Sequence, residues 1–165
     1  MKTDLREAKD ISSPKLGRLQ FVPGFLIRRL SNLFVMSWEN YFSDIEIRIT
    51  PVQAGILILI DENPGITQAE VAHILDVEGP TLVKSIARLE DAGLVVKSPR
   101  PTDRRAFDLN LSDKAKGLVT EIDKRLKQHE RDVFAVLSTK ERSELVVLLQ
   151  RVLASNMKSD AWRQS

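Results

Sequence analysis

Residues 67–111 read TQAEVAHILDVEGPTLVKSIARLEDAGLVVKSPRPTDRRAFDLNL, and this stretch decides the fold. It opens with a capping box, in which Thr67 accepts a hydrogen bond from the backbone of Glu70 and Glu70 accepts one from the backbone of Thr67. Apolar residues then recur at helical spacing. We therefore expect a short helix with three buried side chains: Val71, Ile74 and Leu75.

A second helix is predicted directly after the first. A turn at Val77 to Gly79 is followed by Pro80, which suits the first position of a helix. Gly93 is a typical left-handed helix stop. The expected buried stripe of this helix is Leu82, Ile86 and Leu89. Two helices joined by a short turn that contains glycine are typical of a helix-turn-helix, although other helical hairpins share the pattern.

The segment after Gly93 favours a β-hairpin. Leu94–Val96 is a β-branched, apolar strand candidate, and apolar residues alternate with polar ones from Phe107 to Leu111. The loop expected between them, Lys97–Arg105, carries four cations and one acid. A basic hairpin that directly follows the second helix of a helix-turn-helix, the recognition helix, is called a wing. We therefore predict a mainly α fold with a small two-stranded wing. The winged helix-turn-helix is expected to span Ile45 to Leu111.

The sequence before this stretch predicts two further helices. Thr50 and Gln53 form another capping box, and the helix behind it is expected to stop at Asn63–Gly65. A first long helix is predicted over residues 23–44 from apolar residues at helical spacing: Leu26, Leu30, Leu33, Phe34, Trp38 and Tyr41. Residues 1–22 lack such periodicity, and we expect a flexible or loosely docked extension there.

The sequence after the wing predicts two more helices. The first is capped by Ser112 and carries an apolar stripe that runs from Leu118 to Leu137, and the second begins with a capping box of Ser138 and Glu141. The last helix carries a leucine and valine stripe that nothing else in the chain covers completely. We expect a second subunit to cover it, with residues 23–44 and 112–158 as dimerisation helices of a two-fold homodimer. Packing of the first helix against this stripe within one subunit would cover part of it.

Composition narrows the class of protein. The chain has 165 residues, 42% of them hydrophobic and 29% charged, as in soluble globular domains. Its longest apolar run, Gly55–Ile60, is too short to cross a membrane, and the N-terminus lacks a signal-peptide apolar region. The absence of cysteine excludes disulfides and thiolate zinc sites. We expect a cytoplasmic protein with no membrane partner.

Charge is distributed unevenly, although the formal net charge is only +2. Eight acidic residues face one base between Glu39 and Glu78, whereas six bases face three acids between Gly79 and Ala106. This reversal indicates an anionic partner at one face. An ordinary solvated surface is the alternative.

Three segments together resemble the MarR family of transcriptional regulators. They are the residues before the second helix (Thr50–Gln53), the end of the recognition helix (Leu89–Val95) and the wing (Asp103–Ala106 with Leu109–Ser112). The resemblance covers a MarR-like domain over residues 23–165. It implies a two-fold dimer that binds a pseudo-palindromic operator in double-stranded DNA, most commonly as a repressor.

The recognition helix supplies the first set of predicted DNA contacts. Thr81, Lys84 and Arg88 lie opposite its apolar stripe, and such a helix enters the major groove, where cations donate to guanine. Gly79 and Pro80 keep its start slim. Ordinary surface cations would give the same pattern.

The wing supplies the second set. The resemblance implies that Arg105 reaches the minor groove and that Asp103 braces it, with Arg104 and Arg100 as phosphate contacts. A turn-forming aspartate is the alternative for Asp103.

The resemblance also implies a small-molecule effector, commonly an aromatic acid or a related anion such as an acyl-CoA thioester. The candidate ligand residues are Arg28, Phe34, Trp38 and Tyr41, because aromatic side chains concentrate on the first helix and Arg28 and Arg29 lie near its start. Aromatic residues at helical spacing are usually core, and the two arginines could face DNA or solvent.

Other classes of function are weaker. His73 and His129 show no metal-ligand spacing, and His129 falls on an apolar stripe where a hydrogen-bonded core histidine is expected. A metal-responsive regulator and a winged helix used only for protein contacts remain alternatives. No phosphate-binding loop or nucleophile motif indicates an enzyme, and no metal or other cofactor is expected.

Overall fold

The computed structural model describes residues 16–45, 47–101 and 103–157; the side chains of residues 103–105 and 157 are outside this description. Its residues form two compact units, one ending at Met36 and the other beginning at Ser37. The boundary falls inside α1, Pro23–Phe42, which is preceded by a short 3-10 helix η1, Gly17–Phe21. Most of the predicted extension, residues 1–15, lies outside the described residues.

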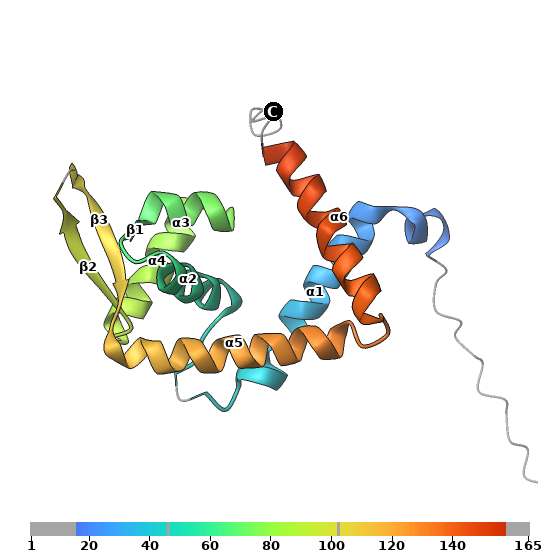
Figure 1. Cartoon of the computed structure of the whole chain (residues 1–165), viewed down its shortest axis with the longest axis horizontal. Helices are drawn as coiled ribbons and strands as arrows, with labels where there is room; N and C mark the ends of the chain where they lie inside the picture. The colour runs from blue at the N-terminus through green and yellow to red at the C-terminus, as the bar shows by residue number, and fades with distance from the viewer. Residues whose placement is uncertain (1–15, 46, 102, 158–165) are drawn as a thin grey trace, which may run out of the picture. The chain divides into compact units, whose positions relative to one another are not determined.

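The second unit contains the predicted helix-turn-helix (Figure 1). Its helices are α2 (Pro51–Glu62), α3 (Gln68–Leu75), α4 (Gly79–Asp91), α5 (Asp113–Val133) and α6 (Thr139–Met157). The capping boxes at α2 and α3 are formed as predicted, because each threonine accepts from the third residue of the helix and that side chain accepts in return. Ser112 caps α5, its Oγ accepting from the Ala115 amide at 3.2 Å.

The wing belongs to a three-stranded antiparallel sheet in the order β1-β3-β2. The strands are β1 (Ile66–Thr67), β2 (Val95–Arg100) and β3 (Asp103–Leu111). The predicted two-stranded hairpin is therefore present, and β1 adds a short third strand through Ile66↔Leu109 and Thr67↔Asp108. The hairpin of β2 and β3 projects beyond the helices (Figure 1).

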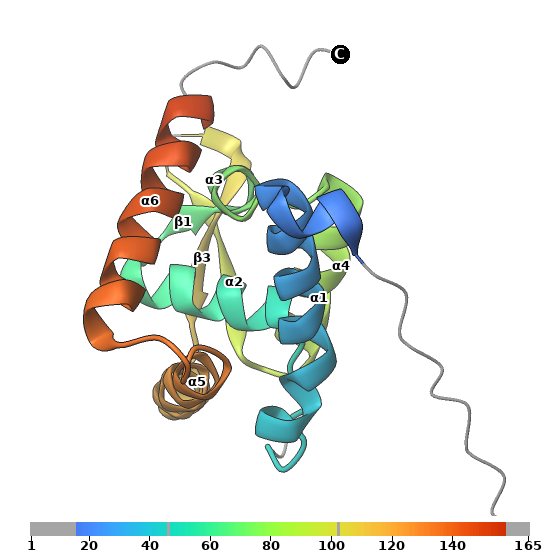
Figure 2. The same ribbon diagram turned by 90° about the vertical axis from the view of Figure 1, so that its right-hand side faces the viewer.

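The core of this unit lies between α2, α4, α5 and the sheet. Seen along α5, helix α2 passes next to it (Figure 2). The predicted stripe of α4 is buried, as are residues from each neighbouring element: Ile56, Leu57, Ile60, Leu82, Ile86, Leu89, Leu109 and Ile122. This packing holds α4 with one face fixed inward, which leaves its other face for a partner.

Four local expectations were wrong. Ile74 on α3 is 50% exposed, although Val71 is buried and Leu75 half-buried. Residues expected in the wing loop continue both strands, since β2 extends to Arg100 and β3 begins at Asp103. Gly79 lies inside α4 rather than in the turn, because left-handed Asp76 ends α3. The helix predicted to reach residue 137 ends at Val133, because residues 134–137 form hydrogen-bonded turns instead.

Candidate nucleic-acid interface

The outward face of α4 carries the predicted recognition residues. Thr81, Lys84 and Arg88 are all exposed, on the side opposite the buried stripe. Ser85 lies between them and donates from its Oγ to the Thr81 carbonyl at 2.8 Å, which keeps this hydroxyl turned back onto the helix. The sequence thus folds into a helix whose solvent face presents one hydroxyl and two long cations.

The two cations of α4 have no ion-pair partner among the residues that the structure describes. By contrast, Lys97 at the start of the wing lies 2.5 Å from the Glu90 carboxylate. An unpaired cation attracts a phosphate or a base acceptor more strongly than a paired one does. Lys84 and Arg88 are therefore the parts of α4 best suited to an anionic partner.

The turn between α3 and α4 is tight. Asp76 ends α3 in the left-handed conformation at φ 50°, which aspartate tolerates better than most residues. The Val77 amide then donates to the Ala72 carbonyl at 3.3 Å. Beside this turn a recess opens between the starts of α3 and α4 and the strand β3, and its lining includes Gln68, Gly79 and Phe107. The recognition helix and the wing therefore border one concave surface.

The wing residues implied to touch DNA are only partly described. Asp103, Arg104 and Arg105 form the start of β3, where Asp103 pairs with Arg100 across the hairpin. Their side chains lie outside the described residues, as does Thr102. The backbone nevertheless puts this basic segment at the tip of the hairpin.

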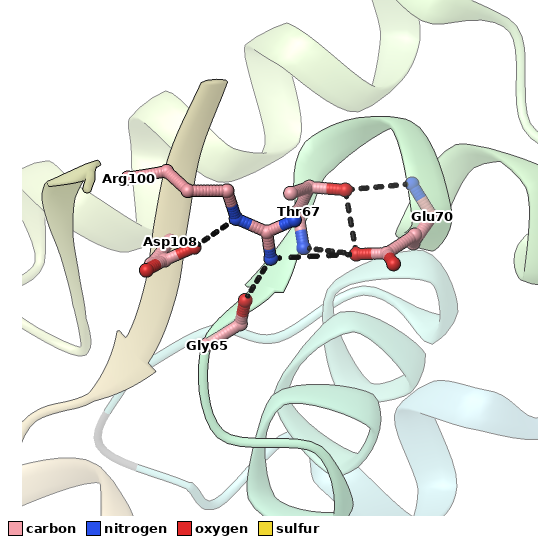
Figure 3. Close-up of polar contacts among 5 residues, drawn as sticks. All are labelled: Gly65, Thr67, Glu70, Arg100 and Asp108. Carbon is pink, nitrogen blue, oxygen red and sulfur yellow. Dashed lines mark hydrogen bonds and ion pairs between the residues drawn. The ribbon is translucent and has the colours of Figure 1, made fainter. Parts of the chain in front are cut away.

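Arg100, the remaining wing cation, is bonded to other residues of the winged helix-turn-helix, residues 45–111, which we call the lobe (Figure 3). Its Nε donates to the Asp108 carboxylate at 2.6 Å, and its Nη2 donates to the Gly65 carbonyl at 2.9 Å. The same Nη2 lies 3.9 Å from Oε2 of Glu70. One side chain of β2 thus links β3, the turn before β1 and the first turn of α3.

Glu70 is held in its charged form. The Thr67 hydroxyl and amide donate to its Oε2 at 2.6 and 2.7 Å. These hydrogen bonds, together with the nearby Arg100 charge, hold the pKa of the Glu70 carboxyl below its usual value. The capping box therefore keeps a negative charge next to Arg100 at neutral pH.

Two of the predicted ligand residues are built into the second unit. Trp38 is buried and stacks on Phe42 with 3.8 Å between ring centroids, and its Nε1 donates to the Ile49 carbonyl at 2.8 Å. Tyr41 is half-buried and donates from its hydroxyl to Asp132 at 2.8 Å. Both side chains thus contribute to the packing of the second unit.

The other two predicted ligand residues, Arg28 and Phe34, belong to the first unit. Arg28 is exposed, with its guanidinium 5.4 Å from the ring centroid of Phe25, and Phe34 is half-buried. Because the four predicted residues are divided between the two units, the ligand site stays a prediction.

His129 is a buried core histidine, as the sequence predicted. Its Nε2 lies 2.7 Å from the Ser37 hydroxyl, and its ring stacks on Tyr41 with 4.5 Å between centroids. Burial lowers the pKa of the imidazole. In the described part of the chain, no three His, Asp or Glu side chains gather to hold a metal ion. None of the helices described there has an apolar stretch that could span a bilayer.

Sequence reasoning missed the partners of Arg100 and Lys97. Gly65 is 35 residues from Arg100 in sequence and Asp108 is eight residues away, and both meet it only through the register of the three strands. Opposite charges at positions 100 and 108 are a signal, but it could be used only once that register was known.

Comparison with known proteins places these features in a family. A family model described as the MarR family matches residues 49–106, which include α2 to α4 and most of the wing. A protein of Thauera aromatica, assigned as the transcriptional regulatory protein for the hcr operon, is 33% identical over 113 residues. That alignment covers 68% of this chain and 68% of the relative.

Solved structures agree with the fold. The chain is similar to the transcriptional repressor CouR bound to a 23-mer DNA duplex, with a TM-score of 0.77 and 28% identity, over 86% of this chain and 99% of CouR. It is also similar to a mutant of MarR from E. coli, with a TM-score of 0.67 and 25% identity, over 79% of this chain and 96% of that one.

Proposed function

The chain belongs to the MarR family of DNA-binding transcriptional regulators, and we propose that it is a repressor whose two-fold dimer binds an inverted-repeat operator. Its family makes it a regulator rather than an enzyme. CouR, to which the chain is similar over most of its length, is a repressor bound to a DNA duplex, which supports both the repressor role and the DNA partner.

The observation that carries this proposal is the outward face of α4. Thr81, Lys84 and Arg88 are exposed, while the opposite face is fixed in the core. A helix held in this way can enter the major groove with its N-terminal turn, where Lys and Arg donate to guanine and Thr contacts a thymine methyl or the backbone. These three side chains would read the operator.

The wing would supply the second contact. Arg105 would enter the minor groove, where the negative potential is strongest when the groove is narrow, with Asp103 bracing its guanidinium. Arg104 would bind a phosphate and set the register of the protein on the duplex. The place of these residues at the tip of the hairpin supports this arrangement.

A dimer would place two such lobes on one duplex. Most apolar residues of α6 are exposed in the single chain, and among them Val147, Val152 and Leu153 are each about 60% exposed. A large exposed apolar face is typical of a subunit interface. Two-fold symmetry then requires an inverted repeat in the DNA.

The effector would be a small aromatic acid or a related anion, including acyl-CoA thioesters. Support comes from the chain itself: the aromatic residues Phe34, Trp38 and Tyr41 on α1, and the exposed Arg28 on the same helix. Such a compound should raise the melting temperature by mass action and release the DNA. A compound that did only one of these would not be the effector.

Titration of a labelled operator duplex over a series of salt concentrations tests the proposed DNA contact. Arg105→Ala should weaken binding to every duplex and reduce the slope of log K against log salt by about 1, because a cation in the minor groove also displaces counterions from the duplex and one such cation is lost. Arg48→Ala is the matched control, since this exposed arginine is paired with Glu39 at 2.9 Å. Unchanged affinity and slope for Arg105→Ala would reject the proposed wing contact.

A further inference from the structure

Arg100 connects its own strand to Asp108 of β3, eight residues later, and to the segment with Gly65 and Glu70, of which Gly65 lies 35 residues earlier. Figure 3 shows its guanidinium between Asp108 of β3, the carbonyl of Gly65 and the Glu70 carboxylate at the start of α3. Its side chain is only 31% exposed. A guanidinium offers donors in a rigid fork, so it can satisfy a carboxylate and a carbonyl at the same time.

The backbone around Arg100 aims the side chain at these partners. The register of β2 against β3 shifts between Pro99 and Arg100. Such bulges re-aim a side chain relative to the regular alternation of a strand. Here the re-aimed side chain reaches across β3 toward the turn that precedes β1.

Gly65 presents its carbonyl to Arg100 through a conformation that favours glycine. Its φ is +83°, and its amide donates to the Leu109 carbonyl at 3.0 Å. The residue is therefore fixed to β3 through its amide and to β2 through its carbonyl. Both bonds attach the turn after α2 to the wing.

The wing needs such an attachment. The third strand β1 contributes only two residue pairs to the sheet. A two-stranded hairpin alone is marginally stable in water and free to bend. Arg100 lies near the hairpin tip, three residues before Asp103, so its contacts restrain the part of the wing that carries Arg104 and Arg105.

We propose that Arg100 is a positioning residue for DNA binding. It fixes the wing to the turn before β1 through Asp108 and Gly65, and it does not contact DNA itself. The inference rests on the proposed wing contact. Its effect is to set the distance and orientation of the wing tip relative to α4. The family resemblance implied a phosphate contact for Arg100, and the two roles predict opposite changes in DNA affinity when Asp108 loses its charge.

Asp108→Asn separates the two roles. Asp108 is a carboxylate on a DNA-binding hairpin, so removing its charge should strengthen binding if Arg100 only contacts a phosphate. If Arg100 positions the wing, the same change turns the ion pair into a neutral hydrogen bond, so it weakens the anchor and lowers DNA affinity, by about tenfold for a coupled pair of this kind. The matched control is Glu78→Gln, because Glu78 is an exposed carboxylate of the same lobe. Its loss should leave affinity unchanged or raise it.

The pair is measured in the full chain by duplex titration of Arg100→Gln, Asp108→Asn and the double variant. Each single variant should weaken binding, and Asp108→Asn should add little in the Arg100→Gln background, because the interaction is already absent. Arg100→Lys keeps the charge but not the fork, so it should lose nearly as much as Arg100→Gln. Hydrogen exchange at the Gly65 and Thr67 amides should quicken in these variants, while α5 exchanges as before.

The outcomes are distinguishable. Asp108→Asn that binds DNA as tightly as the wild type, or more tightly, would overturn the positioning role while Arg105→Ala still weakened binding. Arg105→Ala without effect would instead reject the proposed wing contact, and the inference would be rejected with it. Weakened binding by Asp108→Asn with unchanged exchange at Gly65 would also overturn it, because the wing would not have been released.

Discussion

The basic side chains of the lobe differ in what surrounds them. Lys84 is exposed on α4 and unpaired among the described residues, whereas Lys97 is paired with Glu90 and Arg100 is held by Asp108. The charge of a paired cation is largely neutralised by its partner. A sequence count of bases therefore overstates how many can bind DNA, and the surroundings of each residue decide its role.

Lys84→Ala should change base preference. Lys84 lies on the outward face of α4, where loss of a contact to a guanine should cost about 1–3 kcal/mol at one base-pair position and leave the other positions unaffected. The measurement is a titration against duplexes that each carry one base change. Lys127→Ala is the control, because Lys127 is on α5 and paired with Asp123 at 2.6 Å. Equal weakening across all duplexes would assign Lys84 to a phosphate instead.

His129 should make stability depend on pH. Burial lowers its pKa in the folded chain from the ordinary 6.5, although Asp132 opposes this shift. The unfolded chain therefore binds more protons as pH falls below about 6.5, so the free energy of unfolding decreases there, by at most about 1.4 kcal/mol per pH unit for one group. Urea unfolding between pH 8 and pH 5 measures this. His129→Gln should flatten the decrease, and an unchanged slope would contradict the assignment.

Residue environments were predictable only in part from the sequence. The burial of His129 followed from its place on an apolar stripe, and the exposure of Lys84 followed from its place opposite one. The Arg100 contacts could not be predicted in this way. They depend on the register of strands that bring Arg100 next to Gly65, 35 residues away in sequence, and on a bulge that redirects the Arg100 side chain. Local periodicity carries no information on such contacts.

At the scale of elements, the capping boxes and the glycine stop after α4 were the best-predicted features. Thr50 with Gln53 and Thr67 with Glu70 form their capping boxes, and Gly93 is left-handed at φ 69° after α4. These signals act within four residues, so the sequence contains them completely. Ile74 was wrongly expected to be buried because helical spacing gives one face of α3 but not how widely its neighbours cover that face.

The wing was predicted too short for a physical reason. Pro99 falls in the segment expected as a loop, Lys97–Arg105, yet it lies in β2, which is an edge strand of the sheet. Proline is tolerated at an edge because the missing amide would have faced solvent. The strand β1 was missed because two residues carry no periodicity, and its pairing with β3 is set by the tertiary fold.

Thr67→Ala should destabilise the chain by about 1 kcal/mol, within a range of about 0.5–2 kcal/mol. The Thr67 hydroxyl accepts from the Glu70 amide at 3.3 Å and donates to its carboxylate, and both bonds are lost. Denaturant unfolding measures the change. Thr120→Ala is the control, because that exposed threonine lies within α5, where alanine favours the helix. Equal effects of the two substitutions would mean that the cap contributes nothing.

At the scale of the whole molecule, the apolar face of α6 should bring two chains together. Val152→Glu would place a charge in that interface and should convert a dimer to a monomer, weakening DNA binding by more than tenfold because one lobe then binds alone. Sedimentation of the full chain measures the mass. Gln150→Glu adds the same charge to the same helix outside the apolar stripe and should leave the dimer intact. A wild-type chain that is monomeric at micromolar concentration would contradict the proposed dimer.

The most direct test of the account is selection of bound duplexes from a random library by the wild-type chain. A two-fold dimer with one α4 in each major groove should enrich an inverted repeat whose half-site centres are about 10–10.5 base pairs apart, or a multiple of that spacing. Enrichment of single half-sites or direct repeats, or of no sequence at all, would contradict the proposal that this chain reads DNA as a symmetric pair of winged helices.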